Sequence, residues 1–388
     1  MVYQEDFAVE RWMDEYETKV KLNIAETCCY SLSINEVAEI IGKPFPTEEL
    51  VKARLVYGAI PGSDQLRGQL ADLINETSPG APIKLTKDDV LVTNGAIGAN
   101  FLVYYALAAP GDHVVIADPI YQQLQSVPAM FGAKVERLVL RPENGFLPDL
   151  NELRAMVKKG QTKFINLNSP HNPTGTVIPQ KMMEEIVQIA RDADAYLILD
   201  EVYRPLYHSV PEGETPCSAA TMYEKAVITS SMSKAYGLAG LRLGWVATSN
   251  KELLQECLKR RDYNTISVGL VDDLISSWAM SGRHKLLEYN NKLCRENLKI
   301  VDEFVTQSEG RVSLVRPQAG TTMFVQVNGS SKTTEEICRL LAEKYDTLAV
   351  PGETFGREGF IRIGYANEPE ELREGLSRLN QLLKEHSA

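Results

Sequence analysis

Short apolar runs that alternate with helical stretches fill this chain from about Lys84 to Ser231. The apolar runs are DVLVT, HVVIA, KVERLVL, KFINLN, AYLILD and KAVITSS. Stretches of helical character lie between them, for example at Ile97–Ala109 and Lys181–Ala193. Strands joined by crossover helices predict an α/β fold with a mostly parallel sheet that helices cover on both faces.

The pattern changes after about Ser281, and we expect a second, smaller α+β domain there. A long charged helical stretch, His284–Glu309, precedes several short apolar runs, and an amphipathic stretch at Glu370–Glu385 follows them. The predicted division has three parts: an N-terminal segment, 1–45, that packs with the small domain; a large domain, 46–280; and a small C-terminal domain, 281–388.

The charge and composition of the chain exclude several classes of partner. The 388 residues include 41 Lys and Arg against 52 Asp and Glu, a net charge of −11, whereas nucleic acids and anionic membranes need a basic footprint. No apolar run reaches the ~18 residues that span a bilayer, and the first residues do not resemble a signal peptide. The six cysteines contain no C-x-x-C pair, so no metal site is expected. We therefore expect a cytoplasmic protein without nucleic-acid or membrane partners.

Ligands of open parallel sheets bind beyond the carboxyl ends of the strands, and the most informative segment follows KAVITSS. It reads SSMSKAYGLAGLRLGW and contains Lys234 among small hydroxyl residues. Lys234 could form a Schiff base with a carbonyl group. Ser231, Ser233 and Arg242 could hold a phosphate beside it, because a guanidinium offers paired, permanently charged donors. The alternative is an ordinary solvated loop lysine near a structural arginine.

The run AYLILD ends in Asp200, and Tyr203 follows it. A carboxylate at the end of a buried strand is costly unless it pairs with a cation. A protonated pyridine nitrogen would be such a cation, and Tyr203 could then reach a hydroxyl on the same ring. The alternative is a structural acid that caps the next segment.

Three further strand ends carry candidate residues. KFINLN runs into SPHNPTG, a turn fixed by Pro and Gly that could aim the Asn172 amide into a cleft, with His171 as a residue satisfied inside the turn. DVLVT is followed by Asn-Gly-Ala and a helix, so the free N–H groups at Gly95 and Ala96 could bind phosphate. Tyr121 follows the run HVVIADP, where its ring could stack on a planar cofactor.

Taken together and in this order, these segments resemble the class I/II aminotransferase family of fold-type I pyridoxal-phosphate enzymes, over roughly Tyr57 to Ala366. The shared motifs are S-x-S-K-x-x-G-L-x-G-x-R-x-G, N-P-T-G, D-E-x-Y and the late R-I-x-Y-A. The resemblance implies pyridoxal 5'-phosphate as cofactor and a homodimer with shared active sites.

The resemblance also implies a role for each matching residue. Lys234 would be the Schiff-base lysine and proton shuttle, and Asp200 the partner of the pyridine nitrogen. Asn172 and Tyr203 would contact the ring oxygen. The other implied roles are phosphate binding by Ser231, Ser233, Arg242, Gly95 and Ala96, stacking by Tyr121, substrate contacts by Ala25 and Asn172, a grip on the substrate α-carboxylate by Arg362, and a phosphate contact from the second subunit by Tyr57.

The N-terminal segment Leu22–Tyr30 departs from the pattern of many transaminases. It reads LNIAETCCY in place of a glycine-rich G-x-P segment, and it resembles the L-A-E-N segment of aminocyclopropane-carboxylate synthases and related lyases, which eliminate a β or γ leaving group. The predicted function is an aminotransferase acting at the α-carbon of an L-amino acid, with a 2-oxo acid as second substrate. The alternative is a carbon–sulfur lyase or a cyclopropane-carboxylate synthase-like enzyme. A nicotinamide enzyme is disfavoured because no G-x-G-x-x-G follows a strand.

Overall fold

The computed structural model describes residues 4–211 and 213–387, and its largest element is a seven-stranded sheet with the order β2-β8-β7-β6-β5-β3-β4. Its strands are β2 (Val90–Thr93), β3 (His113–Asp118), β4 (Lys134–Val139), β5 (Thr162–Asn168), β6 (Tyr196–Asp200), β7 (Ala226–Ser231) and β8 (Gly244–Ala247). Neighbouring strands are parallel, except that β8 is antiparallel to β2 and β7. The prediction of a mostly parallel sheet is confirmed, and β8 is the strand that the apolar runs did not reveal.

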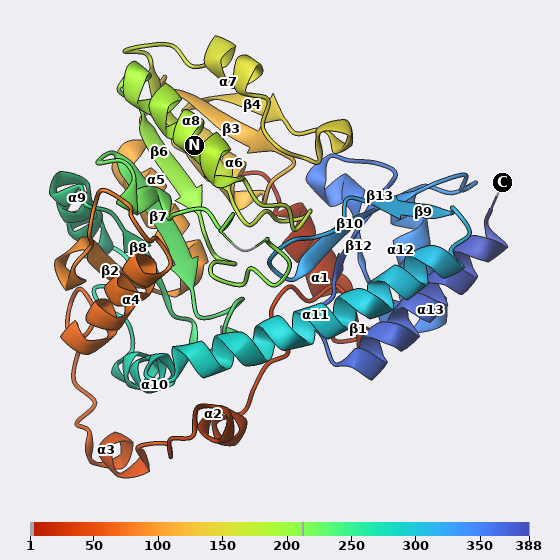
Figure 1. Cartoon of the computed structure of the whole chain (residues 1–388), viewed down its shortest axis with the longest axis horizontal. Coiled ribbons are helices and arrows are strands. Elements are labelled where there is room, and N and C mark those ends of the chain that lie inside the picture. Colours follow the sequence, from red (N-terminus) through yellow and green to blue (C-terminus); the bar gives the residue numbers. More distant parts are fainter. Residues whose placement is uncertain (1–3, 212, 388) are drawn as a thin grey trace.

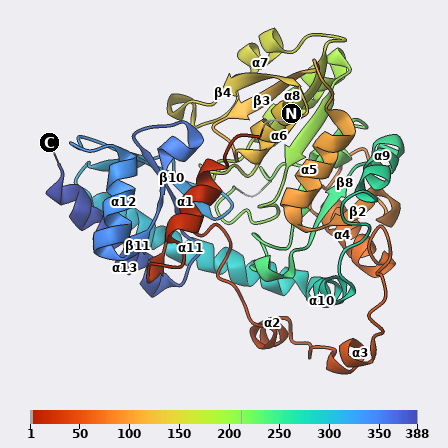
Figure 2. The ribbon, with the colours of Figure 1, turned by 180° about the vertical axis from the view of Figure 1, so that it is seen from behind.

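Helices cover both faces of this sheet, as predicted. Figure 1 shows α8 in front of the sheet, and Figure 2 shows α5 in front of it from behind. The helix α8 turns an apolar face with Ile186 and Ala190 towards the sheet and is polar on its outer face. The helices are α4 (Asp64–Glu76), α5 (Gly95–Leu107), α6 (Gln123–Met130), α7 (Leu150–Met156), α8 (Gln180–Ala193), α9 (Lys251–Arg261) and α10 (Leu270–Met280), with the short 3-10 turns η1 (Lys87–Asp89), η2 (Pro142–Asn144), η3 (Ala219–Thr221) and η4 (Ala239–Leu241).

A second, four-stranded antiparallel sheet has the order β12-β13-β10-β9. Its strands are β9 (Val312–Leu314), β10 (Thr322–Val327), β12 (Val350–Pro351) and β13 (Phe360–Gly364), and its neighbours are α12 (Thr334–Tyr345), α13 (Pro369–Glu385) and η5 (Gly352–Phe355). None of the helices in the described part of the chain is long and apolar enough to cross a membrane.

The long helix α11 (Arg283–Gln307) runs between the regions of the two sheets (Figure 1). Two asparagines on it bind backbone on both sides. Asn290 Nδ2 donates to the Ala235 carbonyl at 2.9 Å, and Asn297 Nδ2 donates to the Tyr365 carbonyl at 2.7 Å. The helix therefore ties the segment that follows β7 to the segment that follows β13.

The N-terminal elements are α1 (Ala8–Tyr16), β1 (Leu22–Asn23), α2 (Ile34–Ile41) and α3 (Thr47–Lys52). The strand β1 pairs in parallel with β11 (Thr347–Leu348), and Trp12 Nε1 donates to the Ala349 carbonyl at 2.9 Å. The chain from β1 thus reaches the four-stranded sheet. The division at residues 45 and 280 stays a prediction, and its residues 1–3, 212 and 388 lie outside the described residues.

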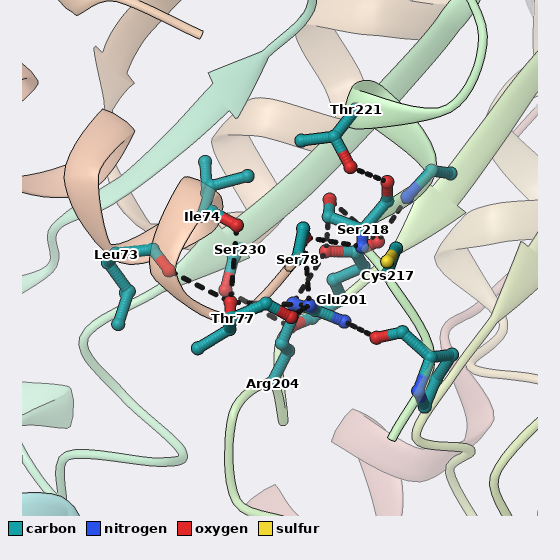
Figure 3. Close-up of polar contacts among 12 residues, drawn as sticks. Leu73, Ile74, Thr77, Ser78, Glu201, Arg204, Cys217, Ser218, Thr221 and Ser230 are labelled. Atoms are coloured by element: carbon teal, nitrogen blue, oxygen red, sulfur yellow. Dashed lines mark hydrogen bonds and ion pairs between the residues drawn. The ribbon is translucent and has the colours of Figure 1, made fainter. Parts of the chain in front are cut away.

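A buried ion pair holds the segment that follows β6 (Figure 3). Arg204 Nε lies 3.6 Å from Glu201 Oε2, and their side chains are only 6% and 2% exposed. The Glu201 carboxylate also accepts hydrogen bonds from Ser218 Oγ and from the Ala219 N–H. Arg204 donates in turn to Thr77, Ser78, Tyr207 and the Pro216 carbonyl. This network fixes the backbone that also carries Tyr203.

We expect Arg204→Met to lower the free energy of unfolding by about 3–5 kcal/mol, because it leaves the Glu201 carboxylate buried without its cation. Urea unfolding of the purified protein measures this change. The matched control is Arg191→Met. Arg191 pairs with Glu224 at 3.0 Å, but its side chain is 42% exposed, so its loss should cost less than about 1 kcal/mol. Equal losses in the two variants would contradict the importance of the buried pair.

Candidate active site

A cavity of about 410 Å³ lies at the carboxyl edge of the large sheet. Asn168, Asp200 and Ser231 line it, and they are the last residues of β5, β6 and β7. These strands are adjacent and parallel, so their carboxyl ends meet at one edge. Residues of α1, of the loop after β1 and of β13 complete the wall. The cavity therefore lies where the sequence places the chemistry-bearing residues.

Lys234 projects into this cavity from the turn after β7. Its ammonium donates to Thr27 Oγ1 at 2.6 Å and lies 3.5 Å from Cys28 Sγ. Glu26 Oε1 is 4.0 Å away. Lys234 is thus not a solvated loop lysine, since the loop after β1 covers it and binds its amine.

Asp200 is a buried carboxylate held by neutral donors. Its Oδ2 accepts from Asn100 Nδ2 and its Oδ1 from the Val202 N–H, both at 3.0 Å. Burial raises the pKa of Asp200 above its usual value, although these hydrogen bonds oppose the rise. No ion pair joins Asp200 to an arginine or lysine in the described part of the chain. A cationic ligand would offset the cost of burying this carboxylate.

Two polar groups beside Asp200 are buried without a partner among the described residues. They are Asn172 Oδ1 and the Tyr203 hydroxyl, and both residues line the cavity. Burial raises the pKa of Tyr203, so its hydroxyl keeps the proton that it would donate. Buried polar groups are nearly always hydrogen-bonded, so this pair indicates a ligand with a polar oxygen at this position.

An anion site adjoins the other side of the cavity, at the N-terminus of α5. Ala96, Ser231, Ser233 and Arg242 line it. The first N–H groups of a helix have no partner within the helix and attract anions. Gly95 has a φ of +68°, and a Cβ there would lie 3.0 Å from the Arg242 guanidinium. The glycine lets the arginine close over the start of the helix.

Arg362 lies on β13 and faces the cavity from the opposite wall. Its Nη2 donates to the Ala25 carbonyl at 3.2 Å, while its Nε is buried without a partner. Burial lowers the pKa of Arg362. No acidic residue forms an ion pair with it in the part of the chain that the structure describes. Because this guanidinium faces a cavity and its Nε–H has no acceptor among the described residues, an anionic ligand would complete its hydrogen bonds.

Of the remaining residues that the sequence singled out, Tyr121 lines the cavity, whereas His171 and Tyr57 do not. Tyr121 lines the cavity and donates to Glu10 Oε1 at 2.8 Å. His171 is satisfied inside its turn, with ring nitrogens bonded to Thr174 and to the Pro119 carbonyl, and burial lowers its pKa to about 4. Tyr57 is 78% exposed and lies away from the cavity. Its assignment to a second subunit stays a prediction.

The cavity thus brings together most of the predicted site residues. They are Ala25, Ala96, Tyr121, Asn172, Asp200, Tyr203, Ser231, Ser233, Lys234, Arg242 and Arg362, with Gly95 against Arg242. Sequence reasoning missed five residues that line the cavity: Glu10, Glu17, Thr27, Asn100 and Asn168. Of these, only Thr27 had a signal, because it lies in the unusual segment Leu22–Tyr30.

Comparison with known proteins decides between families. The family model for aminotransferases of class I and II matches residues 23–379. The chain belongs to the class I and II aminotransferase family. It is 29% identical to capreomycidine synthase of Streptomyces vinaceus, over 98% of this chain and 94% of that protein. It is 29% identical to an aspartate aminotransferase of Pyrococcus horikoshii, over 78% and 77% of the two chains.

The fold agrees with this membership. The structure of a pyridoxal-phosphate-dependent aminotransferase from Streptococcus suis superposes with a TM-score of 0.91 and 36% identity, covering 99% of both chains. The cofactor of the aminotransferase family is pyridoxal 5'-phosphate, and the cavity fits it. The buried Asp200 carboxylate lacks a cation, the Asn172 and Tyr203 groups lack a partner, and the start of α5 offers an anion site. These three features suit a pyridine nitrogen, a ring oxygen and a phosphate.

We expect Gly95→Ala to weaken binding of pyridoxal 5'-phosphate by roughly 10-fold or more, because a Cβ at positive φ adds strain and displaces Arg242. Titration of the cofactor-free protein by fluorescence measures the dissociation constant. Gly98→Ala is the matched control on the same helix, since a Cβ there meets only Asn94 Cβ at 3.7 Å. Equal affinities in the two variants would contradict the role of Gly95.

Proposed function

We propose that this protein is an aminotransferase that moves the amino group of an L-amino acid to a 2-oxo acid. One observation carries the proposal: Lys234 and Arg362 line the same cavity, and the buried Arg362 guanidinium has no acidic partner among the described residues. A covalent anchor for the cofactor and a grip for a substrate carboxylate are what this reaction requires on the two walls.

Lys234 has the central role in this proposal. Pyridoxal 5'-phosphate, when bound, acts as an electron sink for a bond that breaks at the α-carbon of an amino acid. Lys234 Nζ would hold the cofactor covalently, and its amine would carry the proton that leaves the α-carbon of the substrate. The hydroxyl of Thr27, 2.6 Å from Nζ, orients that amine.

Other residues hold the two ring ends of the cofactor. Asp200 would hold the protonated pyridine nitrogen, and Asn100 orients the carboxylate through its 3.0 Å bond. Asn172 and Tyr203 would bind the ring oxygen. Ser231, Ser233, Arg242 and the N–H groups at Gly95 and Ala96 would hold the phosphate, and Tyr121 would lie against the ring.

Arg362 takes both oxygens of the substrate α-carboxylate in a bidentate contact. The Ala25 carbonyl, which accepts from Arg362 Nη2, aims the guanidinium. Asn172 lines the wall of the cavity that would hold the cofactor, and we propose that it also contacts the substrate.

We also propose a homodimer in which Tyr57 contacts the phosphate of the partner subunit. The support is an exposed apolar segment around it, since Val51, Leu55, Val56 and Tyr57 are each at least 66% exposed in a single chain. A contiguous exposed apolar stretch of this kind marks an interaction surface.

A second candidate function is elimination of a β or γ leaving group from the amino acid. The specific observation in its favour is the position of Leu22–Tyr30, the segment that resembles the lyases. Its Thr27 and Cys28 contact the Lys234 amine directly. Because these contacts orient the Lys234 amine, they would influence which atom receives its proton, and elimination differs from transamination in that step.

One experiment separates the two candidates. The holoenzyme is incubated with a panel of L-amino acids, with and without 2-oxoglutarate. Transamination gives a 2-oxo acid and glutamate only when the acceptor is present. Elimination releases the leaving group without an acceptor, together with a 2-oxo acid and ammonia or, after ring closure, a cyclic amino acid. Lys234→Ala should abolish both. Turnover by Lys234→Ala at the wild-type rate would contradict the proposal.

We expect Arg362→Lys to raise KM for every amino-acid substrate by roughly 10-fold or more, because an ammonium cannot reproduce the two-pronged contact. Cofactor affinity should be unchanged. Steady-state kinetics and cofactor titration measure the two quantities. The control is Arg357→Lys, whose side chain pairs with Asp118 at 2.9 Å and does not line the cavity. An unchanged KM with a lower melting temperature would show that Arg362 is only structural.

A further inference from the structure

Three glutamates line the mouth of the active-site cavity. Glu10 lies on α1, Glu17 directly follows that helix, and Glu26 lies in the loop after β1. Glu10 and Glu17 are exposed and Glu26 is half-buried. They converge on one cavity from separate turns of the chain, opposite the cofactor-holding edge of the large sheet.

Glu26 faces the Lys234 ammonium, whereas Glu10 and Glu17 have no ion-pair partner among the described residues. Glu10 Oε1 accepts from the Tyr121 hydroxyl, and Glu26 Oε1 accepts from the N–H groups of Thr27 and Cys28. Across residues 4–211 and 213–387, no ion pair joins Glu10 or Glu17 to a lysine or arginine. Lys234, 4.0 Å from Glu26, is the cation that the cofactor consumes in the proposed function.

The charges at the mouth repel each other. Burial raises the pKa of Glu17, and the charges of Glu26 and Glu10 raise it further. Burial alone would also raise the pKa of Glu26, but Lys234 and the hydrogen bonds from Cys28 and Thr27 lower it overall. A positive group at the mouth would relieve the repulsion among these carboxylates.

A second, independent feature places a ligand in the same cavity. Arg362 is 97% buried, its Nε has no partner, and it faces this space. An amino acid whose α-carboxylate binds Arg362 must extend its side chain along the rest of the cavity. The three cations that line the cavity, Lys234, Arg242 and Arg362, each have an anion or the cofactor to bind. The carboxylates of Glu10, Glu17 and Glu26 are then the charged groups left to contact the side chain of the amino-acid substrate.

We infer that the substrate is an L-amino acid with a cationic side chain, a guanidinium or an ammonium, which Glu10, Glu17 and Glu26 select at the mouth of the cavity. The inference rests on the proposed function for the position of the α-carboxylate. A neutral side chain would leave the carboxylates unpaired, and an anionic side chain would be repelled by them.

The direct test compares ligands that differ only in charge and cannot react with the cofactor. Calorimetry on the holoenzyme measures binding of 5-guanidinopentanoate and of its neutral isostere 5-ureidopentanoate. We expect the guanidino compound to bind at least ~10-fold more tightly, and less so in high salt, because the mouth is partly exposed. A pair consisting of 6-aminohexanoate and hexanoate distinguishes an ammonium site from a guanidinium site. Equal affinities within both pairs would overturn the inference.

Charge-removing variants identify the residues. In E10Q/E17Q the preference for the guanidino compound should fall to within about 3-fold, whereas affinity for the neutral isostere should hold. E15Q is the matched control on α1, because Glu15 faces Arg339 at 3.6 Å and does not line the cavity. E17Q alone serves if the double variant is unstable. A preference that survives both E10Q/E17Q and E17Q would assign the selectivity to other residues and refute the inference.

Kinetics separate this inference from the proposed function. We expect kcat/KM for L-arginine or L-lysine to exceed that for L-citrulline by at least ~10-fold, as the binding preference does. A charge preference in binding without glutamate formation from any amino acid would overturn only the proposed aminotransferase reaction. Glutamate formation without a charge preference would overturn only the cationic substrate.

Discussion

The contact between the loop after β1 and strand β13 is the constraint on which the cavity depends. Gly364 N–H donates to the Ile24 carbonyl at 2.8 Å, and a Cβ on Gly364 would lie 1.6 Å from the Glu26 carbonyl oxygen. Only a glycine permits this approach. The contact brings the Ala25 carbonyl to Arg362 and Thr27 to Lys234, so residues more than 200 positions apart form one wall.

Two buried charges of this cavity, Asp200 and Arg362, have no ion-pair partner among the described residues. The buried Glu201–Arg204 pair stabilises the segment after β6. Asp200, only one residue before Glu201, has neutral donors instead, and Arg362 has only a carbonyl. Burying such groups costs free energy in the protein without ligand. Under the proposed function, the cofactor at Asp200 and the substrate carboxylate at Arg362 would offset that cost.

The sequence allowed prediction of the large sheet because most of its parallel strands are short apolar runs, and the site residues lie at or just after the ends of β5, β6 and β7. Lys234, Asp200 and Asn172 were therefore within reach. Strand β8 was not predicted, since its first two residues, Gly244 and Trp245, end the motif that suggests a ligand-binding loop. Thr27 was missed although its segment Leu22–Tyr30 is unusual, and Asn100 was missed because it enters the site through contacts across the fold. The same holds for Glu10 and Glu17, which look like any solvated helix face until α1 is placed over the cavity.

The helix α11 limits which insertions and deletions the chain can accept near this site. Its Asn290 and Asn297 are seven residues apart, close to two helical turns, so both side chains point to the same side and span about 10 Å. One asparagine grips the carbonyl after Lys234 and the other grips the carbonyl at Tyr365 beyond Arg362. The helix therefore sets the distance between the segments that carry Lys234 and Arg362. An insertion of one residue between the two asparagines would turn one of them by about 100°, so the length of this stretch is fixed even where its outer face is free to vary.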